Sequence, residues 1–110
     1  MAQNMTVQMS NTLDQLVRRL VSRLKPSSIY LFGSQARGEA DPDSDYDLLV
    51  VVPDSLLPRH ERETKAYDAL WGLTSPADVI VLTVAEFEKA KQVPTSLAST
   101  VLREATLLYG

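Results

Sequence analysis

The chain has 110 residues, which is enough for one domain with a hydrophobic core but too few for two. Its 11 Lys and Arg against 14 Asp and Glu give a formal net charge of −3, so no overall basic field favours direct binding to nucleic acid. The absence of cysteine and the single histidine exclude disulfides, zinc–thiolate sites and histidine metal clusters. The sequence shows neither a signal peptide nor an apolar run of about 18 residues, so we expect a cytoplasmic protein without a membrane span.

The first half of the chain predicts one helix and two strands. Leucines and valines at helical spacing predict a helix that starts at residues 10–12 and is ended by Pro26. Residues 29–32 (IYLF) form a short apolar run, which predicts a buried strand that stops at Gly33. Residues 46–52 (YDLLVVV) are apolar at odd and even positions alike, which predicts a central strand covered by helices on both faces.

A second helix is expected from Pro58 to Leu73, because proline suits a first helical turn and the apolar residues recur at helical spacing. Its buried stripe is expected to consist of Ala66, Tyr67, Leu70 and Trp71. Charged residues near its start are expected to form a solvated face: Arg59, His60, Arg62 and Lys65.

The last third of the chain predicts a strand and two helices. Residues 77–83 (ADVIVLT) read as a third strand. Thr83 and Glu86 form a capping-box pattern, which predicts a helix that runs to about residue 91. After Pro94 a final helix is expected to begin at residue 95 or 96, and Tyr109 is expected to pack near the C-terminus.

The stretch GSQARGEADPDSDYDL, residues 33–48, places four aspartates within seven residues. Because residues two apart in a strand point to the same face, Asp45 and Asp47 are expected to lie side by side. Two carboxylates at the mouth of a buried strand resist ionisation without compensation, and a bound Mg²⁺ supplies it. Asp41 and Asp43 precede the strand in a proline-containing turn and are interpreted as solvated turn residues.

The expected topology brings further groups to this acid pair. A helix joins the second and third strands, which predicts that these two strands are parallel. If the first strand is antiparallel to the second, Gly33 and Ser34 arrive at the same edge as the acid pair and Asp78. Gly33 lets the backbone approach a phosphate closely, Ser34 offers a hydroxyl and an amide, and Arg37 can reach phosphate oxygens.

These residues resemble a known family. Gly33-Ser34, ten residues and then Asp45-Tyr46-Asp47 are similar to the signature of the polymerase-beta-type nucleotidyltransferase superfamily. The fuller string GSQARGEADPDSDYDLLVVV resembles the minimal nucleotidyltransferases (MNT), and the resemblance extends from the first helix to the ending LREATLLYG. It implies an α/β (α+β) fold of the polymerase-beta type, a small mixed β-sheet flanked by helices. Residues 1–9 would then be a flexible N-terminal tail and residues 10–110 a single nucleotidyltransferase domain.

The resemblance also implies roles for the acids. Asp45 and Asp47 would hold two Mg²⁺ ions, for which Mn²⁺ can substitute. Asp78 would hold the catalytic ion and would orient or deprotonate the acceptor. Asp68, on the preceding helix, is the second choice for this third acid.

On the nucleotide side, the resemblance implies that Gly33 and Ser34 grip the terminal phosphates of an NTP and that Arg37 neutralises them. MNT proteins are typically antitoxins paired with HEPN-domain RNase toxins. The implied reaction is transfer of AMP from ATP to a tyrosine hydroxyl of the toxin, with release of pyrophosphate.

The chain has no room for the acceptor-binding domain of larger superfamily members, so a partner protein or a second copy is expected to supply the acceptor surface. Two other functions stay open: an antitoxin that neutralises its toxin by binding alone, and a nucleotidyltransferase that acts on a small molecule. A template-directed polymerase is disfavoured by the length of the chain and its lack of a basic surface.

Overall fold

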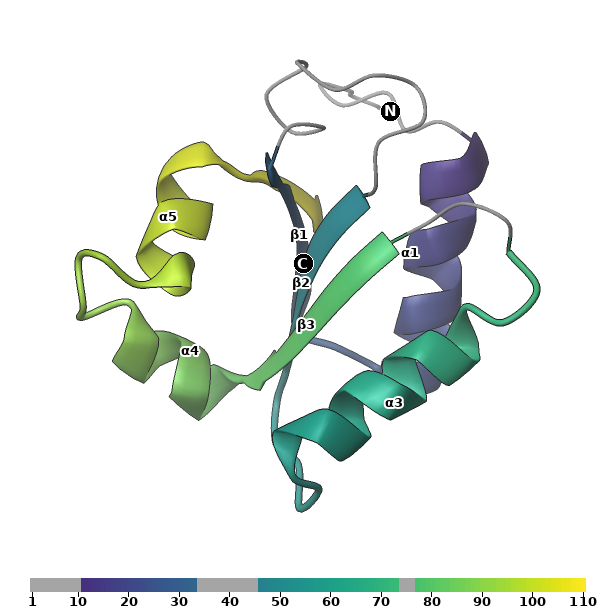
Figure 1. Cartoon of the computed structure of the whole chain (residues 1–110), viewed down its shortest axis with the longest axis horizontal. Helices are drawn as coiled ribbons and strands as arrows, with labels where there is room; N and C mark the ends of the chain where they lie inside the picture. Colours follow the sequence, from purple (N-terminus) through teal and green to yellow (C-terminus); the bar gives the residue numbers. More distant parts are fainter. Residues whose placement is uncertain (1–10, 34–45, 74–76) are drawn as a thin grey trace.

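The computed structural model describes residues 11–33, 46–73 and 77–110, and Figure 1 shows its helices and strands. The predicted tail over residues 1–9 lies outside the described residues. In chain order the elements are α1 (Asn11–Leu24), β1 (Ser28–Phe32), β2 (Tyr46–Val52), α3 (Arg59–Ala69), β3 (Ala77–Thr83), α4 (Val84–Ala90), α5 (Leu97–Glu104) and β4 (Thr106–Tyr109).

The strands form one mixed sheet in the order β3-β2-β1-β4. Strand β1 is antiparallel to β2 and to β4, and β2 is parallel to β3. The predicted pairing of the first three strands is therefore confirmed. Strand β4 was not predicted: the end of the chain returns to the sheet and pairs with β1.

Strand β2 is the centre of the molecule, as its apolar run predicts. Its residues Leu48 to Val52 are all at most 6% exposed, because helices cover both faces of the sheet. In Figure 1, α1 and α3 lie to the right of the sheet and α4 and α5 to its left. Leu48 and Val50 pack toward α1 and α3, whereas Leu49 and Val51 pack toward α4 and α5. The predicted α/β fold with a helix-flanked mixed sheet is confirmed.

Side-chain caps fix the starts of the two C-terminal helices. Thr83 and Glu86 form the predicted capping box, in which the Thr83 hydroxyl accepts from the Glu86 amide at 3.1 Å and the Glu86 carboxylate accepts from the Thr83 amide at 2.9 Å. At α5, the Ser96 hydroxyl accepts from the Ser99 amide at 3.1 Å.

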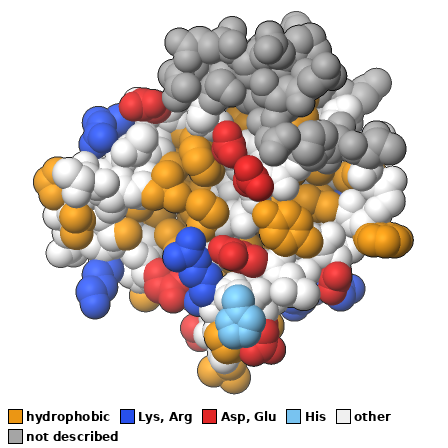
Figure 2. All heavy atoms as spheres, in the orientation of Figure 1, with side chains coloured by type: hydrophobic (Ala, Val, Ile, Leu, Met, Phe, Trp, Pro, Cys, Tyr) orange, Lys and Arg blue, Asp and Glu red, His pale blue; other side chains and the backbone are white. Residues whose placement is uncertain are grey.

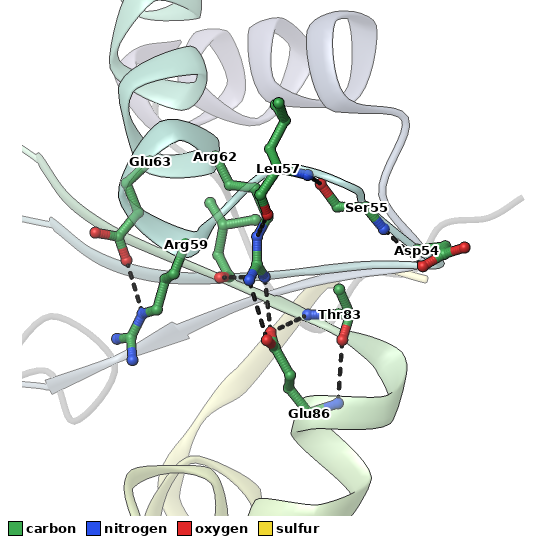
Figure 3. A network of polar contacts seen from close by, with 9 residues as sticks. Asp54, Ser55, Leu57, Arg59, Arg62, Glu63, Thr83 and Glu86 are labelled. Carbon is green, nitrogen blue, oxygen red and sulfur yellow. Dashed lines mark hydrogen bonds and ion pairs between the residues drawn. The ribbon is translucent and has the colours of Figure 1, made fainter.

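Arg62 is 7% exposed, so its expected place on a solvated face is wrong. Its guanidinium donates two hydrogen bonds to the Glu86 carboxylate, at 2.7 and 3.0 Å, and one each to the carbonyls of Val81 and Leu57, as Figure 3 shows. The hydrogen bonds from Arg62 lower the pKa of Glu86 to about 2, and the same carboxylate raises the pKa of Arg62. This Arg62–Glu86 clamp ties α3 to the start of α4 beside β3.

Two aromatic residues expected in the core are exposed instead. Trp71 is 84% exposed and Tyr67 is 45% exposed, whereas Ala66 and Leu70 are buried as predicted. Helix α3 ends at Ala69, so helical spacing no longer directs the side chain of Trp71. Residues Arg62, Ala66 and Leu70, four apart, form the buried line of this segment, and Tyr67 lies beside it.

Candidate active site

Asp47 and Asp78 lie side by side at one edge of the sheet. They are register partners in the parallel pair β2–β3, and neighbouring strands are separated by about 4.8 Å. Both side chains share a face with Leu49 and Ile80, two positions further along each strand, and that face packs against α4 and α5. The prediction that Asp78 lies beside Asp47 is confirmed, since the two residues are register partners in adjacent strands.

Gly33 lies next to Asp47, on the side of β2 that is opposite to Asp78. It follows Phe32, the register partner of Asp47 in the antiparallel pair β1–β2. Its φ of +76° lies in the left-handed region that glycine tolerates best. A Cβ at this position would collide with a carboxylate oxygen of Asp47 and stand 3.2 Å from its Cγ. Gly33 is thus required both by its backbone conformation and by the approach of Asp47.

Ser34, Arg37 and Asp45 lie outside the described residues, as do Asp41 and Asp43. The alternative third acid, Asp68, lies elsewhere: it lines a hollow between α1 and α3 together with Arg18, Arg19, Ser22, Arg23 and Ala69. Of the two candidates for the third carboxylate, Asp78 is the one in register with Asp47.

The edge that carries these acids is open to solvent. Asp47 is half-buried and Asp78 is exposed. Figure 2 looks onto the side of the molecule that presents β3 and shows acidic side chains next to hydrophobic ones. The Arg62–Glu86 clamp lies at the opposite end of β3, beside Val81 and Thr83, and so does not neutralise these acids.

Sequence reasoning missed two features beside Asp78. The hydroxyl of Tyr67 accepts a hydrogen bond from the Val79 amide at 3.0 Å, on the free side of β3. Tyr67, Leu70, Trp71, Gly72, Leu73 and Ala77 line a pocket of about 450 Å³, here called the aromatic pocket. Aromatic residues near the end of a helix that leads directly into the Asp78 strand were the available signal.

The described groups suit a divalent cation and a phosphate ester. Two carboxylates on one face supply the hard oxygen ligands that Mg²⁺ prefers. The residues described include no cluster of three or more acidic, histidine or cysteine side chains that could hold a metal, and the third predicted ligand, Asp45, falls outside them. Gly33 has no side chain of its own, so its backbone and the Asp47 carboxylate lie close together at this edge.

Fold and site together define a nucleotidyltransferase domain. The family described as "Nucleotidyltransferase domain" matches residues 13–108, so the chain belongs to this family. Within the part of the chain that the structure describes, the match spans all eight helices and strands, apart from the first two residues of α1 and the last residue of β4.

Solved structures narrow the resemblance within this family. A crystal structure of a toxin–antitoxin with AMP-PNP is 29% identical, with a TM-score of 0.55, over 92% of this chain and 74% of that one. A variant of the toxin–antitoxin MntA-HpeT, with two aspartates two positions apart changed to glutamate, is 25% identical with a TM-score of 0.60, over 92% and 74%. A crystal structure of a protein from Sulfolobus solfataricus, 21% identical with a TM-score of 0.53 over 91% of this chain and 87% of that one, shares the fold. No curated protein sequence matches significantly.

Proposed function

We propose that this chain is the antitoxin of a HEPN/MNT toxin–antitoxin pair and that it transfers AMP from ATP to a tyrosine hydroxyl of the HEPN RNase toxin. The proposal includes a single nucleotidyltransferase domain over residues 10–110, acting in the cytoplasm. The observation that carries it is the alignment of Asp47 and Asp78 on one face, with Gly33 held against Asp47. The likeness to toxin–antitoxin structures, one of them with a nucleotide analogue, supports the choice of partner and of ATP.

In the proposed reaction, the backbone of Gly33 and the hydroxyl of Ser34 hold the terminal phosphates, and Arg37 offsets their charge. Asp45, Asp47 and Asp78 would hold Mg²⁺, or Mn²⁺ in its place. When bound, these ions stabilise the charge on the attacking and leaving oxygens.

The tyrosine oxygen attacks the α-phosphorus, a new P–O bond forms, and the bond to the pyrophosphate oxygen breaks. Asp78 orients the tyrosine hydroxyl and accepts its proton. The product carries added negative charge and bulk, which would repel RNA from the toxin.

The test is mass spectrometry of the toxin after incubation with this chain, ATP and Mg²⁺. The toxin should gain the mass of one AMP unit or a multiple of it, on a tyrosine. Asp47→Asn should still fold and still bind the toxin, but transfer should fall at least about 100-fold because a metal ligand is lost where the transition state needs charge stabilisation.

Two outcomes point to the other functions. If Asp47→Asn neutralises the toxin as well as the wild type does, and neither protein changes the mass of the toxin, the chain is an antitoxin that acts by binding alone. If the toxin is untouched and not bound, while a small hydroxylated molecule accepts AMP, the chain is a small-molecule nucleotidyltransferase.

A further inference from the structure

The aromatic pocket lies directly beside the proposed catalytic edge. Ala77, which lines it, precedes Asp78, and Tyr67 holds the amide of Val79, which follows Asp78. Because Ala77 and Asp78 are neighbours in β3, their side chains point to opposite faces of the sheet: the pocket lies on the side of α1 and α3, and Asp78 on the side of α4 and α5. Both adjoin the start of β3, which is an edge strand of the described sheet. Its most exposed large hydrophobic member is Trp71, at 84%.

The backbone around Trp71 is held in place before any partner binds, by a hydrogen bond from α1 and by the turn at Gly72. The Arg19 guanidinium donates a hydrogen bond to the Trp71 carbonyl at 2.7 Å, which ties the end of the α3 segment to α1. Gly72, with a φ of +91°, lets the chain turn away directly after Trp71. A pocket held in place before binding loses less entropy when a partner occupies it. Exposed tryptophan and tyrosine beside smaller apolar residues are the usual composition of a protein-binding hot spot.

The order of groups along the edge indicates what the pocket receives. Gly33 follows β1, Asp47 is on β2, Asp78 is on β3, and the aromatic pocket lies beyond β3. In an in-line displacement, the attacking and leaving oxygens lie on opposite sides of the phosphorus. If the terminal phosphates lie at Gly33, the acceptor arrives from the side of β3, where the pocket is.

The charge around the pocket favours an acidic acceptor segment. The neighbouring hollow, about 520 Å³ in volume, is lined by three arginines and one aspartate: Arg18, Arg19, Arg23 and Asp68, with Ser22 and Ala69. Asp14 pairs with Arg18 at 2.7 Å and offsets one of the three positive charges, and Asp68 offsets a second. The hollow therefore keeps a net positive charge. A segment that fills the aromatic pocket and continues over α1 would therefore be matched by acidic side chains.

We infer that the aromatic pocket docks the toxin segment that carries the modified tyrosine, and that acidic residues of this segment contact the arginines of α1. The inference rests on the proposed function and adds to it the surface that presents the acceptor. It also gives this domain a surface that can select the acceptor.

Trp71 is the only tryptophan of the chain, so its fluorescence reports on the pocket directly. With the full chain and selective excitation of tryptophan, adding the toxin should shift the emission of Trp71 to shorter wavelengths, because the ring leaves water. ATP with Mg²⁺ alone should leave the emission unchanged. A shift with ATP and Mg²⁺ alone would assign the pocket to the nucleobase, and a shift on raising the concentration of this chain alone would assign it to a second copy; either result overturns the inference.

Substitution gives the second arm of the test. Trp71→Ala should weaken toxin binding at least about tenfold in calorimetry and leave ATP binding unchanged. The matched control is Leu56→Ala, because Leu56 is a fully exposed apolar residue, 101% exposed, in the segment after the far end of β2. It should bind the toxin as the wild type does.

The outcomes separate the inference from the proposed function. A complex that forms and is modified, with unchanged Trp71 emission and equal affinity in Trp71→Ala, overturns the inference and leaves the proposed function standing. If no complex forms with the toxin at all, both are contradicted.

Discussion

At the scale of single residues, Gly33 offers the sharpest test of the site because the chain contains a matched control. Gly33 and Gly72 both have positive φ, +76° and +91°, so an alanine at either position is strained. They differ in their surroundings: a Cβ at Gly33 meets the Asp47 carboxylate, whereas a Cβ at Gly72 has nothing within 4 Å.

We therefore expect Gly33→Ala and Gly72→Ala to lose similar backbone stability, about 1 kcal/mol each. Gly33→Ala should lose more in addition, because Asp47 must move, and its AMP transfer should fall at least about 100-fold. Denaturant unfolding and the transfer assay measure the two effects. Because Gly72 lines the aromatic pocket, Gly72→Ala is the control for stability alone, and transfer by Gly33→Ala at the wild-type rate would show that Gly33 does not form part of the site.

Local patterns in the sequence were enough to predict that Asp78 lies beside Asp47. Asp47 and Asp78 each open an apolar strand, and the helix between the strands requires them to be parallel. Spacing failed for Arg62, since its partner Glu86 is 24 residues away and long-range pairs leave no local pattern. Spacing also failed for Trp71, because α3 ends at Ala69, two residues before Trp71, and the side chain of Trp71 no longer follows the helical spacing.

At the scale of elements, β3 is an edge strand whose free side is covered by side chains. Tyr67 accepts from the Val79 amide, Arg62 donates to the Val81 carbonyl, and Glu86 accepts from the Thr83 amide. Unpaired backbone groups at a sheet edge invite pairing with another chain, and these side chains occupy them. The helices α3 and α4 thus protect the edge that carries Asp78.

We expect Tyr67→Phe to leave the Val79 amide without its hydroxyl partner. Since Tyr67 is 45% exposed, water can replace the hydroxyl, so global stability should fall by less than about 1 kcal/mol. The amide hydrogen of Val79 should exchange faster, while that of Leu49 in the centre of the sheet should not. Unchanged exchange at Val79 would show that the hydroxyl does not protect the edge.

The Arg62–Glu86 clamp predicts a dependence of stability on pH. The pKa of Glu86 is lowered from 4.5 to about 2, first by the hydrogen bonds from Arg62. Its stabilisation is therefore fully present above about pH 4.5 and is lost as the pH falls toward 2. Because the Glu86 side chain is 45% exposed, solvent screening limits the contribution to about 1 kcal/mol.

Denaturant unfolding between pH 5 and pH 2 should show this loss in the wild type, and Glu86→Gln should show a smaller one. Glu63→Gln is the control, since Glu63 forms an exposed pair with Arg59 at 3.2 Å and should change stability by about 0.5 kcal/mol or less. A steeper fall in Glu86→Gln than in the wild type would contradict the assigned direction of the pKa shift.

Strand β4 marks the limit of prediction for elements. It is four residues long, TLLY, with half-buried and exposed residues in alternation, and it follows α5 directly. Four residues are too few for a reliable strand pattern, and only the long-range pairing with β1 defines it. The longer elements carry enough periodicity for their type to be read locally.

At the scale of the whole molecule, the hydrophobic core and the candidate site occupy different parts of the sheet. Two hydrophobic layers hold β2 from both sides, and the candidate site lies at one end of that strand, on a face shared with α4 and α5. The end of β3 that carries Asp78 is solvent-exposed, while the other end is held by the Arg62–Glu86 clamp. None of the helices over residues 11–33, 46–73 and 77–110 is long and apolar enough to cross a membrane.

This arrangement predicts that nucleotide and metal stabilise the fold together. A ligand that binds only the folded state adds about 2.7 kcal/mol when present at 100 times its Kd. ATP with Mg²⁺ or Mn²⁺ should therefore raise the Tm of the wild type by several degrees, and EDTA should abolish the rise. The double variant Asp45→Asn/Asp47→Asn should lose it, because the carboxylates that would hold the metal are gone.

Leu56→Ala is the control for this measurement, since it alters an exposed residue away from the site and should keep the full rise in Tm. An equal rise in Tm for the wild type and the double variant would place nucleotide binding elsewhere on the molecule.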